Sequence, residues 1–220
     1  IGHYDSLSIE IVIIFGMIMA SLPFILFVKI YNNDIKSLFF DKQVKGFFFL
    51  LLASIFIIAI WLNTKLNFNF IEALRVSAFN VISIITGTGY STEDFSKWGG
   101  FAIGLLFIFM LVGGCTGSTT GGIKIFRIQI LFKVIIQQIQ KVIRPHQILK
   151  ITYSKALIDD KTTLSILALI FLFIASVFII AAILYFIGLD LLTAFSAAAT
   201  SIAVVGPGLS EEIGPTGNFN

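Results

Sequence analysis

Two short segments of this sequence combine glycine with small residues in a way that suits cation binding by the backbone. They read TGTGY (Thr86–Tyr90) and VVGPG (Val204–Gly208). A ring of backbone carbonyls can replace the hydration shell of a cation, and glycine allows the positive φ angles that turn successive carbonyls in one direction. Either segment alone could equally be an ordinary glycine turn at a helix end. Their equivalent positions in an internal repeat, described below, favour the cation-binding interpretation.

A third segment, the decamer GGCTGSTTGG (Gly113–Gly122), interrupts an otherwise apolar part of the chain. A phosphate-binding loop would need a G-K-[ST] ending after a strand, whereas here Lys124 follows GGI and no strand is predicted before it. Glycine and serine can also kink a helix, but ten residues are more than a kink needs. We therefore favour a flexible segment that breaks a helix below the carbonyl site, binds cavity water and opens or blocks the path.

Lys124, directly after the decamer, has two possible roles. Its charge could add an electrostatic barrier at the mouth of the cavity, or its side chain could anchor the helix at the membrane interface. The residues of the predicted gate are Gly113, Gly114, Cys115, Thr116, Gly117, Ser118, Thr119, Thr120, Gly121, Gly122 and Lys124.

The elements that must position these segments are membrane helices. The sequence is 57% hydrophobic with a mean hydropathy of +1.00, and 12% of its residues are charged, against about 25% in soluble domains. A helix needs about 20 mostly apolar residues to cross a bilayer. The predicted spans are Ile11–Val28 with a kink at Pro23, Gly46–Leu62 ending near Trp61, Gly99–Val112 continued beyond the decamer by Ile123–Ile139, and Thr162–Leu189.

Two further apolar stretches are too polar or too short to cross a bilayer. Phe70–Ile85 contains Glu72 and Arg75, and Leu191–Val205 is rich in Ala, Ser and Thr. Each is followed by one of the glycine turns. Both stretches are therefore predicted to be re-entrant half-helices whose partially negative C-terminal ends point at the centre of a pore.

The Lys and Arg residues predict the orientation of these elements in the membrane. Twelve of the fifteen lie between residues 29 and 45 or between residues 124 and 161, and none follows Lys161. Positive charge favours the cytoplasmic side, so the two glycine turns are predicted to face outward. The acidic residues of the outer side would raise the local cation concentration or simply be solvated. These are Glu72, Glu93, Asp94, Asp190, Glu211 and Glu212.

The order of span, half-helix, glycine turn and span occurs once in full and begins again after the second basic stretch. The period from Gly89 to Gly206 is 117 residues. We expect an all-α integral membrane fold of repeated span–pore half-helix–span units. The predicted divisions are an inner helix at 1–31, a cytoplasmic loop at 32–45, one repeat at 46–140 with its pore loop at 70–94 and broken inner helix at 99–140, a cytoplasmic linker at 141–161, and a further repeat at 162–220.

Four longer segments carry a resemblance to a known family. GGCTGSTTGGIKIFRI resembles the signature of the Trk/Ktr/HKT superfamily of potassium transport subunits, and in particular its bacterial Trk type. SIITGTGYSTEDFSKWG (Ser83–Gly99) resembles the third pore loop of that family, and AAATSIAVVGPGLSEEIGPTGNF (Ala197–Phe219) resembles the fourth. YDSLSIEIVIIFGMIMASLPF (Tyr4–Phe24) is similar to the inner helix that closes the second repeat.

The resemblance implies a subunit of four pseudo-repeats around one pore, of which this chain would hold the end of the second, the third, and the fourth up to its filter. It implies one filter glycine per repeat, here Gly89 and Gly206. The usual family pattern has Thr where Gly87 stands and Asn where Val204 stands. Both departures keep the backbone carbonyl but lose a side chain that could brace the filter. The carbonyls implied to line the filter are those of Gly87, Thr88, Gly89, Val204, Val205 and Gly206.

By the same resemblance, the function is potassium uptake across the cytoplasmic membrane, with a homodimer and a cytoplasmic ring of nucleotide-binding regulatory subunits as partners. The potassium ion is the transported substrate, and neither a cofactor nor nucleic acid is expected. The basic face Lys133–Lys161 could dock the ring or reflect topology alone. Sodium-coupled or mixed sodium/potassium transport is the near alternative, and a non-conducting scaffold is a third. An enzyme is not expected, because His3 and His146 lie outside the spans and no His, Asp or Glu lies within one.

Overall fold

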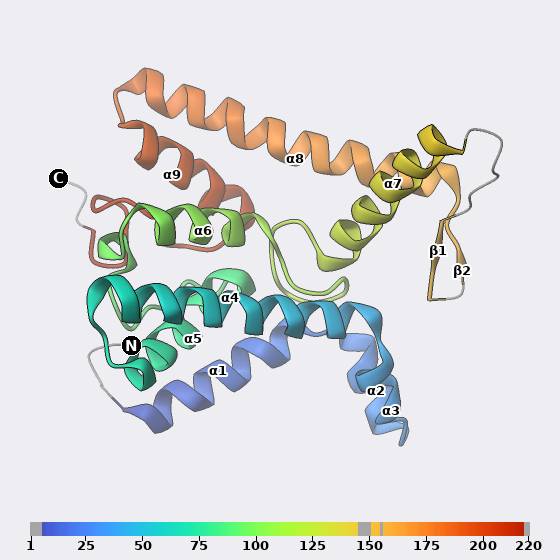
Figure 1. Ribbon diagram of the computed structural model, residues 1–220, viewed down its shortest axis with the longest axis horizontal. Helices are drawn as coiled ribbons and strands as arrows, with labels where there is room; N and C mark the ends of the chain where they lie inside the picture. Colours follow the sequence, from blue (N-terminus) through green and yellow to red (C-terminus); the bar gives the residue numbers. More distant parts are fainter. Residues whose placement is uncertain (1–5, 145–150, 155, 218–220) are drawn as a thin grey trace.

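The computed structural model describes residues 6–144, 151–154 and 156–217 of the chain. His3 and His146 lie outside these residues. Figure 1 shows a set of long helices with shorter ones enclosed between them. In chain order the elements are α1 (Leu7–Ser21), α2 (Phe24–Tyr31), α3 (Lys36–Phe40), α4 (Lys42–Leu66), α5 (Phe70–Thr86), the 3-10 turn η2 (Phe95–Lys97), α6 (Gly100–Leu111), α7 (Ile125–Ile143), β1 (Thr152–Tyr153), β2 (Ala156–Leu157), α8 (Asp160–Ile187) and α9 (Leu191–Ala203).

Two of the described helices, α4 and α8, are long and apolar enough to cross a membrane. They have 25 and 28 residues; α4 contains the predicted span Gly46–Leu62, and α8 covers the predicted span Thr162–Leu189 except for its last two residues. A third span is possible only if α1 and α2 are counted together, because the chain bends by 96° between them. Proline cannot continue the hydrogen-bond ladder of a helix, and Pro23 lies directly before α2. The bend at Pro23 is a complete break rather than the expected kink.

Each long helix packs against one shorter helix, which gives two similar pairs. The long helix α4 packs against α5, α8 packs against α9, and α6 contacts both α5 and α9. In Figure 1, α9 returns from one end of α8 towards the middle of the molecule, where the segment after α6 also lies. The largest cluster of buried apolar side chains includes Phe47 of α4, Phe79 of α5 and Leu106 of α6, each fully buried. The predicted half-helices Phe70–Ile85 and Leu191–Val205 are the helices α5 and α9, with ends shifted by one and two residues.

A partly buried ion pair joins α1 to the first half-helix. Arg75 of α5 donates from Nε to Glu10 Oε2 and from Nη2 to Glu10 Oε1, both at 2.8 Å. Glu10 is only 5% exposed. A buried carboxylate needs a paired cation, because losing one partner leaves an uncompensated charge. The charge that makes α5 a poor membrane span is thus used to hold α5 against its neighbour.

The basic stretch after α7 contains a small β-hairpin that the sequence did not predict. Its strands pair Thr152 with Leu157 and Tyr153 with Ala156. Tyr153 donates a hydrogen bond to Gln129 Oε1 of α7 at 2.6 Å, so the hairpin lies against that helix. The helix α7 itself ends at Ile143, three residues beyond the expected limit of the broken inner helix.

Candidate cation site and the loop beneath it

The two half-helices end in the same backbone geometry. The residue after α5 is Gly87, with φ 67°, and the residue after α9 is Val204, with φ 56°, so both are left-handed. The amide after each of these residues closes the helix end with the same hydrogen bond. Thr88 donates to the carbonyl of Ser83, and Val205 donates to the carbonyl of Thr200, both at 3.0 Å. This is the 6→1 bond of a Schellman cap. The equivalence supports the period of 117 residues at the level of individual hydrogen bonds.

Val204 adopts this left-handed conformation at a cost in backbone strain. The left-handed region is strained for a β-branched residue, whereas glycine and asparagine adopt it more easily. The side chain of Val204 is 67% exposed, so it gains little from packing in return. The backbone at this position is therefore held by its surroundings rather than by the preference of the residue itself.

The segments that follow the two half-helices lie against each other. Gly89 has φ 75° and Gly206 has φ 113°. A Cβ built on Gly89 would overlap the carbonyl oxygen of Val205 and lie 3.0 Å from Cδ of Pro207. A Cβ on Gly206 would lie 3.6 Å from Cα of Gly89. The structure thus brings the six sequence-predicted residues together as two adjoining backbone segments, one from each repeat.

Side chains behind these segments hold them in place, and sequence reasoning did not find them. Thr200 Oγ1 of α9 accepts a hydrogen bond from the amide of Gly206 at 2.9 Å. In the other repeat, Asn80 of α5 donates to Thr92 Oγ1 at 2.9 Å and accepts from the Thr92 amide at 3.3 Å. Position 197, which is 117 residues after Asn80, is Ala197, so the repeat gives no sequence signal for this brace.

The outer ends of the two segments are also tied together. Asp94 Oδ2 accepts a hydrogen bond from Thr216 Oγ1 at 2.8 Å, which links the segment after α5 to the segment after α9. Burial raises the pKa of Asp94, but hydrogen bonds from Ser96 and Thr216 outweigh this effect and lower the pKa below its ordinary value. The carboxylate is therefore charged at neutral pH and keeps the link between the loops.

We expect Asn80→Leu to loosen the first segment. The substitution removes both side-chain bonds to Thr92 at a fully buried position and leaves the Thr92 amide without its acceptor. An unsatisfied buried polar group costs about 1–3 kcal/mol. The protein should lose about this much stability, which a thermal-unfolding measurement checks. Ser201→Ala on α9, where an exposed hydroxyl bonds only the Ala197 carbonyl, is the matched control. Unchanged stability in Asn80→Leu would show that the brace is dispensable.

The decamer forms a closed loop between α6 and α7. Its neck is an isolated parallel bridge between Val112 and Ile123. The amide of Ile123 donates to the Leu111 carbonyl at 2.8 Å, and the amide of Gly113 donates to the Ile123 carbonyl at 2.9 Å. The inner helix is therefore broken here, as predicted, and both sides of the break are fixed to each other.

The loop fills the break between α1 and α2. The carbonyls at the end of α1 accept from it, Ser21 from the Cys115 amide at 3.0 Å and Ala20 from the Thr119 amide at 3.2 Å. In return, the Phe24 amide at the start of α2 donates to the Gly117 carbonyl at 3.0 Å. The expectation that cavity water satisfies the polar groups of the loop is wrong for these amides. The break at Pro23 leaves free carbonyls and amides in a neighbouring helix, and the loop pairs with them.

The far side of the loop contacts the half-helix ends. A Cβ built on Gly121 would overlap the carbonyl oxygen of Ala203, the last residue of α9. A Cβ on Gly87 would lie 3.7 Å from the amide nitrogen of Gly121. The loop backbone thus lies directly against the start of both glycine-containing segments, as Figure 1 shows for α9 and the segment after α6.

Lys124 holds the loop from inside. Its ammonium donates to the carbonyl of Thr120, to Thr120 Oγ1 at 2.8 Å, and to the carbonyl and hydroxyl of Ser118 at 3.5 Å. Lys124 is also the residue before the first turn of α7, where a positive charge is unfavourable because the helix dipole is positive there. Hydrogen bonds to loop oxygens offset this disadvantage. The ammonium therefore binds the loop instead of extending to a membrane interface.

The sequence of this chain is similar to that of a family of cation transport proteins. The sequence model of one family, described as TrkH, cation transport protein, matches residues 1–219. The Trk system potassium uptake protein TrkI of Halomonas elongata is 39% identical over 92% of this chain and 41% of its own length. The potassium uptake protein TrkG of Escherichia coli K12 is 28% identical over the whole chain and 46% of its own length. The chain thus spans a little under half the length of these relatives.

A solved structure gives the same result for the fold. The crystal structure of the potassium transporter TrkH from Vibrio parahaemolyticus superimposes with a TM-score of 0.92 over the whole of this chain and 48% of that protein, at 24% sequence identity. At this identity the likeness concerns the fold. It supports the expected all-α membrane architecture of span and half-helix units.

Proposed function

Because this chain belongs to the TrkH cation transport protein family, we propose that the subunit containing it takes up potassium across the cell membrane through a backbone-carbonyl filter. The observation that carries the proposal is the pair of adjoining segments after α5 and α9, each entered through a left-handed residue and each with a positive-φ glycine two positions later. The relatives named above are potassium uptake proteins of the Trk system. The filter residues remain those predicted from the sequence, Gly87 to Gly89 and Val204 to Gly206.

The physical reason is the cost of removing water from a cation. Carbonyl oxygens can replace the hydration shell, and the C-terminal end of a helix carries a partial negative charge of about half an elementary charge. Both half-helices end at the proposed filter, at Thr86 and Ala203. Their dipoles would therefore favour a cation at the position where their carbonyls meet.

The loop Gly113–Gly122 is the proposed gate. It contacts the residues that begin both filter segments, and it is held by the α1–α2 break on one side and by Lys124 on the other. Opening the path would require these hydrogen bonds to break together. A loop held by several weak bonds can move as a unit when a regulatory partner shifts α7, which directly follows the loop.

A homodimer and a cytoplasmic nucleotide-binding ring remain the proposed partners of the whole subunit. The basic side chains of the α7–hairpin region support a docking surface, since Lys133 bonds the Thr152 carbonyl and lies 5.5 Å from the centre of the Tyr153 ring. Sodium-coupled or mixed transport is the second candidate function. It is favoured only by the departures at Gly87 and Val204, which remove side chains that could tighten the filter.

Reconstitution of the full-length subunit in liposomes tests the proposed function. Potassium flux should exceed sodium flux under equal gradients, and barium, a divalent ion of similar size to potassium, should compete with potassium. Equal fluxes would favour mixed transport instead. Absence of flux of either ion from a folded subunit would support the scaffold interpretation.

Neutralising Lys124 should open the proposed gate. In Lys124→Gln the side chain keeps a donor but loses the charge that binds the oxygens of Thr120 and Ser118. Hydrogen bonds to charged groups contribute about 1.5–3 kcal/mol, so basal flux should rise about tenfold or more. Lys124→Arg, which keeps the charge, should stay close to the parent protein. A fall in flux in Lys124→Gln, with normal abundance in the membrane, would argue that Lys124 assists conduction.

Cysteine labelling tests the proposed orientation. The native Cys115 is fully buried and can stay unchanged. A membrane-impermeant thiol reagent added to intact cells should label Glu93→Cys and leave Thr152→Cys unlabelled, because both positions are exposed but are predicted to lie on opposite sides. The reverse pattern would overturn the orientation derived from the Lys and Arg distribution.

A further inference from the structure

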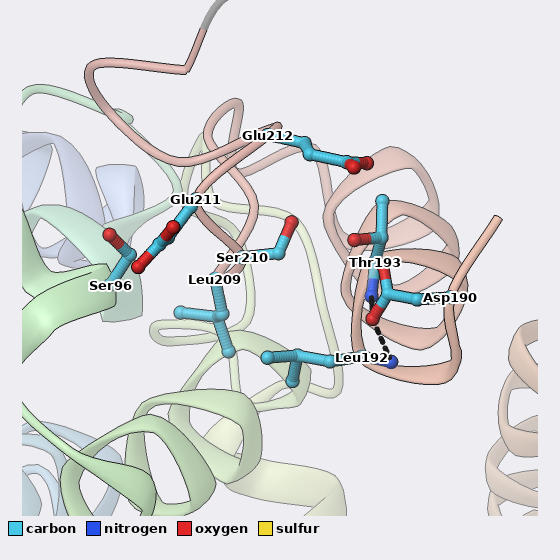
Figure 2. A pocket seen from close by; sticks show the side chains of 8 residues that line it. All are labelled: Ser96, Asp190, Leu192, Thr193, Leu209, Ser210, Glu211 and Glu212. Atoms are coloured by element: carbon cyan, nitrogen blue, oxygen red, sulfur yellow. Dashed lines mark hydrogen bonds between the residues drawn. The ribbon is translucent and has the colours of Figure 1, made fainter.

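A pocket of about 360 Å³ lies outside the proposed filter, between the start of α9 and the fourth pore loop. Figure 2 shows its lining side chains, which come from the first turn of α9, from the segment after Gly208 and from Ser96 of η2. Neither the filter nor the gate uses these residues. The lining residues are Ser96, Asp190, Leu192, Thr193, Leu209, Ser210, Glu211 and Glu212.

The charge of the pocket is negative. Three of its lining residues are carboxylates, and none is Lys or Arg. Hydrogen bonds from Thr193 and from the Leu192 amide lower the pKa of Asp190, so this carboxylate is ionised at neutral pH. The basic residue adjacent in sequence to Ser96 is Lys97, which pairs with Asp94 at 3.3 Å.

A buried hydroxyl in the same pocket has no protein partner: Ser210 is 7% exposed, and its hydroxyl oxygen has no hydrogen-bond partner among the described residues. The hydroxyl of the fully buried Thr193 makes no hydrogen bond of ordinary geometry either, but it lies close enough to Asp190 to lower the pKa of that carboxylate. In Figure 2 both hydroxyls point into the space between α9 and the loop, from opposite sides. Buried polar groups are normally paired, and an orphaned group needs an explanation such as an ion or a water. The Ser210 hydroxyl is independent of the carboxylates and indicates the same occupant.

We propose that this pocket binds a hydrated divalent cation at the outer mouth of the subunit. Three carboxylates favour a double charge over a single one by Coulomb attraction. No group of three His, Cys, Asp or Glu residues within the described chain is close enough to chelate a bare metal ion, so the ion must keep most of its water. Magnesium-like ions do so. Six waters occupy roughly 180 Å³ at about 30 Å³ each, which fits within the 360 Å³ of the pocket.

The bound cation would act on the proposed filter through the fourth loop. Ser210 follows Gly206 by four residues. The Gly208 amide donates to the Ile213 carbonyl at 2.7 Å, which closes a turn that contains Ser210. An ion held between Thr193 and Ser210 would fix the start of α9 to this turn. It would also partly neutralise the acidic side chains that attract potassium to the mouth.

Manganese, an octahedral oxygen-binding ion with an electron paramagnetic resonance signal, is a direct probe for this site. The purified full-length subunit should bind Mn²⁺ with a dissociation constant on the order of 10⁻⁴ to 10⁻³ M, the range of extracellular metal sites. Mg²⁺ should displace it, whereas potassium at the same concentration should not. Displacement by equal potassium would overturn the preference for a divalent ion. Absence of Mn²⁺ binding at millimolar concentration would overturn the site.

Two double variants test which side chains of the pocket bind the cation. Asp190→Asn with Glu212→Gln removes two charges, and asparagine still caps α9, so the fold should persist while Mn²⁺ binding weakens about tenfold or more. Thr193→Val with Ser210→Ala removes the two hydroxyls and should weaken it less. Glu72→Gln, an exposed acidic residue outside the pocket, is the control. Equal binding in all variants would assign the ion to another place. The readout is binding without transport, so a negative result would leave the proposed potassium uptake intact.

Discussion

Gly89→Ala in the full-length subunit is expected to reduce the preference for potassium over sodium by about tenfold or more. Gly89 has φ 75°, an angle that costs a residue with a Cβ about 1 kcal/mol or more. The new Cβ would also overlap the carbonyl oxygen of Val205 and lie 3.0 Å from Pro207 Cδ. Val205 contributes one of the proposed filter carbonyls, so relief of this overlap must move a cation ligand. About 1.4 kcal/mol is a tenfold difference in affinity, which is large for two similar cations and small against the stability of a folded domain.

The equivalent glycine of the other repeat provides a graded comparison. Gly206 has φ 113°, but a Cβ there would meet nothing closer than Gly89 Cα at 3.6 Å. Gly206→Ala therefore adds backbone strain without overlap, and its effect should be in the same direction but smaller. Gly16→Ala in α1, with open space around it, should have none. Ratios of potassium to sodium uptake in cells lacking other uptake systems measure all three. An unchanged ratio in Gly89→Ala at normal membrane abundance would falsify the filter assignment.

Gly121→Ala is expected to raise basal cation flux in the absence of any activating partner. A Cβ on Gly121 would overlap the Ala203 carbonyl at the end of α9, so the loop would have to retreat from the helix end. Overpacking of this kind costs about 1–3 kcal/mol, which corresponds to a shift of about 5- to 150-fold between closed and open loop. Shortening the decamer, or replacing it with an alanine-rich helix, should act in the same direction because it removes the same contact.

Gly117 supplies the matched control within the loop. It also has a positive φ, 82°, but a Cβ built on Gly117 would have nothing within 4 Å. Gly117→Ala should therefore strain the loop without an overlap at α9, and its basal flux should rise less than that of Gly121→Ala. Potassium efflux from liposomes containing the purified subunit measures both variants. Equal flux in Gly121→Ala and the parent, with both shown to be folded, would count against a gating role for the contact.

The sequence by itself determined the order of the long apolar helices and the half-helices. Hydropathy and length specify the spans, because an unpaired backbone group in lipid costs several kcal/mol and the chain must form helices there. Glycine and proline act on the residues next to them, so the break at the decamer and a bend at Pro23 were predicted from the sequence, although the bend proved to be a complete break. The repeat of 117 residues identified Gly89 and Gly206 as equivalent, and the helix caps of α5 and α9 agree with it. All of these features depend on local composition or on a regular spacing.

The tertiary structure decided what each polar group contacts. Glu10 and Arg75 are 65 residues apart, and Thr119 binds Ala20 across 99 residues. Neither pair has a spacing that predicts contact, because the direction of each side chain depends on how the helices pack. For the same reason, loop amides that were predicted to bind cavity water instead donate hydrogen bonds to a second broken helix. The sequence specified where the chain must leave the helical state, and only packing determined that two such breaks meet.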